Sequence, residues 1–85
     1  MSSHRITYEG PSSLAVATAT LVADAGGVDL TASAPPVRSD GGSRSIGPMD
    51  SVVLVLTVEG TDDAVETAVA NLRAGLPPGA SLTVG

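Results

Sequence analysis

The sequence predicts an α+β fold with the ferredoxin-like order β-α-β-β-α-β, in which four antiparallel strands carry two helices on one face. Short segments in which apolar and polar residues alternate lie near both ends of the chain and in its middle, as strands with one buried face require. Two segments with apolar residues at helical spacing lie between them, and each is followed by glycine, which commonly ends helices. The run Val52 to Leu56 is wholly apolar, which indicates a strand that is central or covered on both faces.

The 85 residues are enough for one domain, and we expect it to span residues 1–85. The predicted strands cover about residues 5–9, 28–34, 51–59 and 80–84, the helices about residues 12–25 and 61–75, and a long polar loop residues 35–50. In the ferredoxin-like order the first and third strands are central, which agrees with the third strand being the most apolar. The core must be built from Val, Leu and Ala, because Tyr8 is the only aromatic residue.

The first helical segment, residues 12–25, allows two interpretations. As a helix, capped by Ser12 or Ser13 and ended by the glycine pair at 26–27, it would bury one stripe of residues. That stripe consists of Leu14, Thr18, Leu21, Val22 and Ala25. As a strand, the segment would use the alternating β-branched residues Val16, Thr18, Thr20 and Val22. We favour the helix, because the alanines and the glycine pair fit it better.

The second helical segment begins with a strong N-terminal signal. Thr61 is a favourable N-cap residue. The acidic residues Asp62, Asp63 and Glu66 follow it, where the helix dipole favours negative charge. Their spacing is not that of a calcium-binding loop, so we expect no metal site and no cofactor here. The predicted buried stripe of this helix is Val65, Ala68, Val69, Leu72 and Leu76.

Charge and composition exclude several classes of partner. The net charge is −5, and four arginines are the only cations, which disfavours binding to nucleic acid or to anionic membranes. The chain has no cysteine, hence no disulfide and no thiolate metal site. Its longest apolar run is far shorter than the roughly 18 residues of a membrane-spanning helix. Because we also recognise no signal peptide, we expect a soluble, cytoplasmic bacterial protein.

The sequence does not indicate an enzyme. His4 is the only histidine, and it lies so close to the N-terminus that we expect it to be frayed and solvated. A catalytic base needs a fixed partner at hydrogen-bond distance, and no nucleophile motif such as GxSxG accompanies it. We therefore expect no catalytic residues.

The first helix offers a candidate interaction surface. Asp24 is the only charged residue between positions 11 and 27, whereas a helix exposed to water usually carries charge on its outer side. The residues predicted on this outer side are Val16, Ala19 and Ala23. We expect another protein, or a second copy of the chain, to pack there. The predicted edge strands 28–34 and 80–84 are a second candidate, because they are short and only weakly protected by charge.

The loop at residues 35–50 is a third candidate surface. Loops of this length are often functional in so small a domain. Arg38 and Arg44, with the backbone amides of the loop, could hold a phosphate or carboxylate, although the segment is not a P-loop. Ile46 and Met49 are sizeable apolar groups that could anchor a partner protein.

The order of these segments resembles the effector-associated constant component domains, small domains encoded in actinobacterial conflict gene clusters. The resemblance is carried by the strand VDLTASAPP at 28–36, the apolar strand DSVVLVL at 50–56 and the Ala/Val-rich helix that follows. It covers most of the chain but contains no invariant chemical motif. The chain departs from the family in its sparse arginine, its uncharged first helix and its longer loop. The resemblance implies a non-enzymatic adaptor between a sensor and an effector protein, with no catalytic residues to carry over.

The residues and the resemblance together predict a non-catalytic interaction or adaptor module of a bacterial signalling or conflict system. We expect it to form a homo-oligomer or to dock an effector or sensor protein. The alternative is a small regulatory domain that binds an anion or metabolite through the loop.

Overall fold

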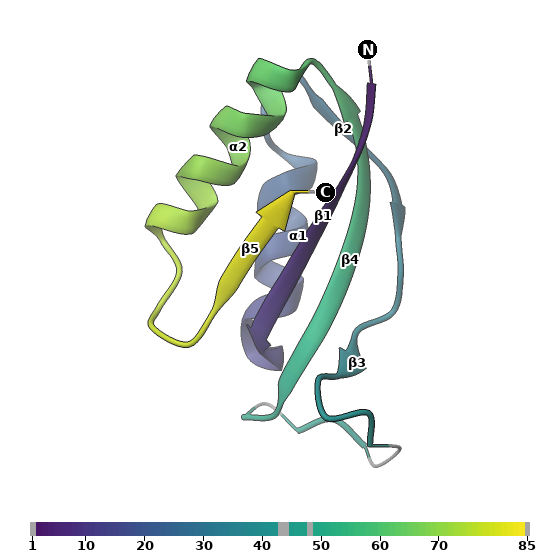
Figure 1. Ribbon diagram of the computed structural model, residues 1–85, viewed down its shortest axis with the longest axis vertical. Helices are drawn as coiled ribbons and strands as arrows, with labels where there is room; N and C mark the ends of the chain where they lie inside the picture. Colours follow the sequence, from purple (N-terminus) through teal and green to yellow (C-terminus); the bar gives the residue numbers. More distant parts are fainter. Residues whose placement is uncertain (1, 43–44, 48, 85) are drawn as a thin grey trace.

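A computed structural model describes residues 2–42, 45–47 and 49–84 of the chain (Figure 1). These residues form an antiparallel sheet of five strands with two α-helices, so the predicted α+β class is confirmed. The elements in chain order are β1 (Ser2–Pro11), the 3-10 turn η1 (Ser12–Leu14), α1 (Ala15–Ala23), β2 (Val28–Ser33), β3 (Val37–Arg38), β4 (Ser51–Gly60), α2 (Asp62–Ala74) and β5 (Ser81–Val84).

The two longest strands, β1 and β4, form the middle of the sheet. The strand order is β2-β4-β1-β5, and β1 pairs with β4 from Ser2 opposite Gly60 to Pro11 opposite Ser51. The expectation that the first and third predicted strands are central is therefore confirmed. A sheet that packs on a core has apolar residues on at least one face of its central strands, and the run Val52 to Leu56 supplies them in β4.

Strand β3 lies inside the segment that was predicted to be an irregular loop. It pairs with β4 through Val37 opposite Val53 and Arg38 opposite Val52. The prediction of four strands is wrong for this reason. Strand β2 pairs only with the half of β4 that ends at Gly60, so β3 satisfies backbone groups of the other half.

The helical interpretation of the first segment is confirmed, but the helix is shorter than expected. The prediction that Ser12 or Ser13 caps it is wrong, since the segment opens with η1 and shows no side-chain cap. Ser12 is used differently: its hydroxyl donates to the carbonyl of Gly47, and its N–H donates to the carbonyl of Asp50. The start of this helical segment is thereby tied to the segment before β4.

Helix α2 follows its prediction closely. The hydroxyl of Thr61 accepts a hydrogen bond from the N–H of Ala64 at 3.2 Å, which is the expected N-cap. Asp62 and Asp63 lie in the first turn and Arg73 in the last, as the helix dipole favours.

The core lies between the sheet and the two helices. The alternate residues Val52, Leu54, Leu56 and Val58 of β4 are buried there, together with Val22 of α1 and Val65 and Val69 of α2. Tyr8 is fully buried beside them, and its hydroxyl donates to the carbonyl of Pro11 at 2.7 Å. Burial raises the pKa of the Tyr8 hydroxyl above its usual value. The core is aliphatic around this single ring, as expected.

The opposite side of the sheet has no helix over it. The odd-numbered residues of β4, such as Val53 and Val55, point to this side and are half-buried. In Figure 1 both helices lie behind or beside the sheet, which leaves the near face of β1 and β4 uncovered. We call this side the open sheet face; it consists of the odd-numbered residues of β1 and β4 and their cross-strand neighbours. The alternative that the strand is covered on both faces does not hold within the described residues.

Candidate functional site

The outer side of α1 is the most apolar helix surface of the protein. Val16 is 75% exposed and Leu21 is 56% exposed. We call the exposed residues of this helix the α1 outer face; they are Val16, Ala17, Thr20, Leu21 and Ala23. None of them is charged. Of the three residues of this helix that were predicted to bind a partner, Val16 and Ala23 are exposed.

Two residues of α1 were assigned to the wrong side. Ala19 was predicted on the outer side but is half-buried. Leu21 was predicted to be buried but is exposed, because the fully buried residues of the short helix are Ala15, Thr18 and Val22. These three residues follow a spacing of three and four, and Leu21 lies just outside that stripe. Because Leu21 is exposed, the apolar surface of α1 is larger than the sequence predicted.

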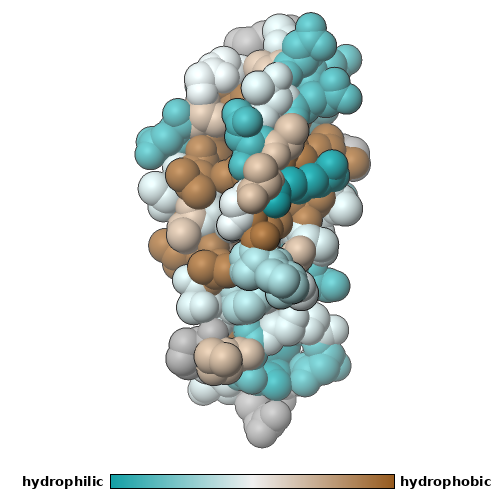
Figure 2. Space-filling model, turned by 90° about the vertical axis from the view of Figure 1, so that its left-hand side faces the viewer, coloured by the Kyte–Doolittle hydropathy of each residue, from teal (hydrophilic) through white to brown (hydrophobic). Residues whose placement is uncertain are grey.

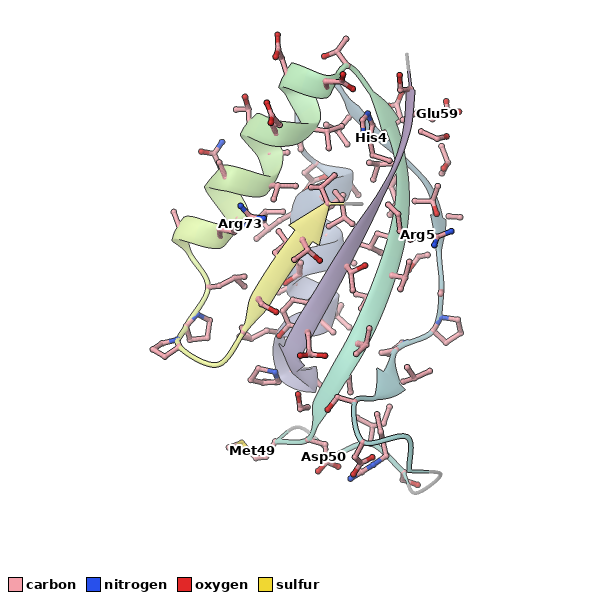
Figure 3. All side chains as sticks on the ribbon, viewed as in Figure 1. His4, Arg5, Met49, Asp50, Glu59 and Arg73 are labelled. Atoms are coloured by element: carbon pink, nitrogen blue, oxygen red, sulfur yellow. The ribbon has the colours of Figure 1, made fainter. Side chains whose placement is uncertain are left out.

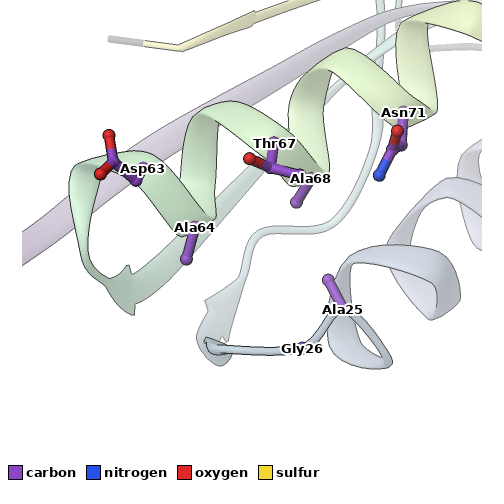
Figure 4. A pocket seen from close by; sticks show the side chains of 7 residues that line it. All are labelled: Ala25, Gly26, Asp63, Ala64, Thr67, Ala68 and Asn71. Carbon is purple, nitrogen blue, oxygen red and sulfur yellow. The ribbon is translucent and has the colours of Figure 1, made fainter.

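Shallow grooves flank α1 on both sides. Between α1 and α2 lies a groove of about 140 Å³, lined by Leu14, Ala17, Thr18, Leu21, Asn71, Leu72, Gly75 and Leu76. It meets, at Asn71, a second hollow of about 320 Å³ where Ala64 and Ala68 of α2 face Ala25 (Figure 4). On the other side of α1, a hollow of about 190 Å³ is lined by Ala15, Val16, Ala19, Thr20, Ser33, Pro36 and Leu54. Both sides of the helix therefore have recesses that could receive a partner's side chains.

Hydrophobic surface gathers around the middle of the molecule. In Figure 2, which views the protein from the side of α2, hydrophobic residues occupy the middle, while the upper end is mostly hydrophilic.

Arg38 is held inside its own segment. Its Nε and Nη2 donate to the two carboxylate oxygens of Asp40, both at 3.1 Å, and Nη1 donates to Asp50 Oδ2 at 2.8 Å and to the carbonyl of Ser45 at 3.4 Å. The side chain is only 8% exposed. Hydrogen bonding to Asp40 raises the pKa of Arg38, and the same bond lowers the pKa of Asp40. Two carboxylates thus already neutralise the guanidinium that was predicted to bind an anion.

The other predicted residues of this segment have separate positions. Met49 is 89% exposed and projects at the lower end of the molecule beside Asp50 (Figure 3). Ile46 is also exposed, though less so. Arg44 lies outside the described residues. The hydrogen bond between Ser12 N–H and the Asp50 carbonyl brings Met49 to the end of the molecule where α1 begins.

The edges of the sheet are better protected than expected. Arg73 of α2 donates from Nε to the carbonyl of Leu82 in β5 at 2.8 Å, which occupies a backbone acceptor of that edge (Figure 3). Strand β2 has a register irregularity between Leu30 and Ala32, and two prolines follow it. Bulges, prolines and charged side chains are common means of blocking edge pairing. The edges are therefore poorer docking sites than the α1 outer face.

His4 is not frayed, which corrects the expectation. It lies within β1, opposite Val58 of β4, and its side chain is largely buried. Its Nε2 lies 3.1 Å from Asp62 Oδ1, at the start of α2, although the described residues form no hydrogen bond to Nε2. The sequence could not indicate this contact, because it depends on where α2 begins above the sheet.

Two chemical features are missing from the described part of the chain. It contains no group of three or more His, Cys, Asp or Glu side chains that could hold a metal ion. Within the same residues, no helix has both the length and the hydropathy needed to cross a bilayer. Comparison with protein-family models gave no match, and comparison with curated proteins found none that is significantly similar.

Proposed function

We propose that this protein is a non-catalytic interaction module that docks a partner protein on the α1 outer face. The observation that carries the proposal is the exposure of Val16 and Leu21 on a helix whose outer side has no charge. A water-facing helix normally carries charged residues there, and contiguous exposed apolar residues commonly mark interaction sites.

The energetics favour a partner on this surface. Fully burying an exposed valine or leucine contributes about 1.5–3 kcal/mol, so Val16 and Leu21 supply the anchors of an interface. The grooves beside α1 make this surface concave, and Leu14, Leu72 and Leu76 give one of them an apolar lining. A partner that presents an apolar helix or loop, with side chains that enter these grooves, fits this surface best.

The non-catalytic part of the proposal is supported by the surroundings of His4. A general base must reach both a nucleophile and an orienting group. Among the described residues, His4 Nε2 lies 3.1 Å from Asp62 Oδ1, and no hydroxyl hydrogen-bonds to Nε2. The anion-binding alternative is not favoured by any observation, since Arg38 is already paired with Asp40 and Asp50.

The proposal also places the protein in the ferredoxin-like class and in the cytoplasm of a bacterium, as an adaptor of a signalling or conflict system. The central positions of β1 and β4 support the fold class. The adaptor role rests on the resemblance to effector-associated constant component domains. On this proposal the partner on the α1 outer face is the effector or the sensor protein.

Site-specific cross-linking in the host cell tests the proposal. A photoreactive amino acid at Val16 should give one adduct of defined mass with a partner protein, and Leu21→Glu in the same chain should abolish it. The matched control places the photoreactive amino acid at Glu66, which is exposed on α2. Absence of any adduct from position 16, or the same adducts from position 66, would contradict the proposal.

A further inference from the structure

We infer that the partner docks through a basic amphipathic helix that lies in the groove between α1 and α2. The inference rests on the proposed function and names the chemical class of the docking element. The groove consists of two hollows, of about 140 and 320 Å³, that meet at Asn71, and we call the two together the helix groove. The apolar side chains of the docking helix lie in the helix groove, and a lysine or arginine of the docking helix lies at its acidic end.

The walls of the helix groove are two helices that run in opposite directions. Leu14 and Leu76 lie at one end of it, whereas Ala25 and Ala64 face each other near the other end (Figure 4). From residue 14 to residue 26 the wall is about 18 Å long, which is the length of about three helical turns. An α-helix bonds its own backbone groups and offers no edge to a strand. The helix groove therefore recognises its ligand through side chains, as grooves that bind amphipathic helices do.

The half of the helix groove beside Leu14 is apolar. Leu14 and Leu21 line it from one side, and Leu72 and Leu76 line it from the other. None of the described residues that line this half is charged. Apolar side chains at positions i, i+3 or i+4, and i+7 of a ligand helix are the usual anchors in a groove of this kind. This half therefore fits the apolar face of the docking helix.

The other end of the helix groove carries two carboxylates. Asp63 of α2 lines the hollow there. Asp24 is the C-cap residue of α1 and directly precedes Ala25 and Gly26, which line the same hollow. Both carboxylates are exposed, and neither forms an ion pair with another described residue. This end is therefore open to a cation from a partner.

Asp24 is unfavourable for the helix that it ends. The C-terminus of a helix carries partial negative charge and is stabilised by a nearby cation. Helix α2 has Arg73 in its last turn, but α1 has no basic residue in its last turn and is followed by Asp24. A lysine or arginine of a bound helix would interact favourably with both the Asp24 carboxylate and the end of α1.

The cation for this end has to come from outside the described chain. Arg73 donates to the carbonyl of Leu82 in β5, Arg38 is paired with Asp40 and Asp50, and Arg5 lies in β1 on the open sheet face. A second copy does not supply a basic helix, because Arg73 is the only basic residue of its two α-helices. The net charge of −5 also favours encounter with a basic partner.

A phage-displayed library of random peptides of about 16 residues tests the inference. Selection on the wild-type protein should enrich peptides with apolar residues at helical spacing and a lysine or arginine near one end of that apolar series. The affinity of the most frequent peptide is then measured by fluorescence anisotropy. Added salt should weaken its binding, and Leu21→Glu should abolish it.

Asp24→Lys is the decisive variant, because its effects on binding and on folding have opposite signs. It should weaken peptide binding by about tenfold or more. In urea denaturation it should be at least as stable as the wild type, since a cation suits the end of α1. Glu66→Lys makes the same change in charge on α2 but outside the residues that line the helix groove, so it should bind the peptide like the wild type. If Asp24→Lys does not fold, Asp24→Asn/Asp63→Asn replaces it and should weaken binding about threefold or more.

Four outcomes would overturn the inference: no enriched peptide, enriched peptides without basic residues, an Asp24→Lys variant that binds normally, or a Glu66→Lys variant that binds as weakly as Asp24→Lys. The cross-link from position 16 separates the inference from the proposed function. Asp24→Lys should reduce that adduct, and an undiminished adduct would contradict the basic helix while leaving the docking surface intact. Absence of the adduct in the chain without this substitution would contradict the proposed function itself.

Discussion

The two helices lie side by side over one sheet, yet their own residues specify them to different degrees. Helix α2 has a Thr61 cap, acidic residues in its first turn and Arg73 in its last turn. Helix α1 has no side-chain cap, no acidic residue in its first turn and no basic residue in its last turn. The outer side of α2 carries polar residues such as Glu66 and Asn71, whereas that of α1 carries Val16 and Leu21. Helix α2 thus has its own end signals and a polar outer side that suits contact with water. Helix α1 has neither and depends on packing against the rest of the protein.

The largest expected difference between the helices concerns their apolar residues. Val65 of α2 is buried against the sheet, so Val65→Ala should lower the free energy of unfolding by about 2–3 kcal/mol through lost burial and an internal cavity. Leu21 of α1 is larger but exposed, so Leu21→Ala should change the free energy of unfolding by less than about 0.5 kcal/mol. Urea denaturation of the purified protein measures both. Equal losses for the two variants would contradict the assignment of Leu21 to a docking surface.

A smaller effect is expected at the N-cap of α2. Thr61→Ala removes the hydroxyl that accepts from the Ala64 N–H and should cost about 1 kcal/mol, again measured by urea denaturation. Thr61→Ser retains the acceptor and should preserve most of that stability. Ser12→Ala, at the start of the other helical segment, removes a bond to the Gly47 carbonyl instead of a helix cap. A Thr61→Ser variant as unstable as Thr61→Ala would show that the cap is not the source of the effect.

The same contrast explains how much of the structure could be predicted. The four predicted strands are marked by local alternation of apolar and polar residues, and α2 is marked by its N-cap and the charges at its ends. Their positions could therefore be predicted from the sequence. The end of α1 and the side on which Leu21 lies depend on how the helix packs on the sheet. Strand β3 depends on its pairing with β4. Two residues such as Val37 and Arg38 become a strand only because β4 presents an unpaired edge beside them.

The candidate sites divide in the same way. The exposure of Val16 followed from the absence of charge on its helix, which is a local property. The pairing of Arg38 with Asp40 and Asp50 did not follow, because acidic and basic residues are interspersed along that segment and the sequence does not indicate which of them meet. The open sheet face could not be identified either. A wholly apolar strand predicts cover on both sides, but the sequence does not reveal that the helices cover only one.

The smallest expected effect comes from supplying α1 with one of the signals that α2 already has. Ser13 is exposed in η1, at the second position of the continuous helical segment that runs from Ser12 to Ala23. Ser13→Asp places a negative charge near the N-terminus of that segment and should stabilise the protein by about 0.3–1 kcal/mol at low ionic strength. Thermal unfolding followed by circular dichroism measures the gain, which salt should reduce. Ser13→Asn is the uncharged control and should not show the salt dependence. A gain of the same size in both variants would mean that local hydrogen bonding, and not the missing charge, limits α1.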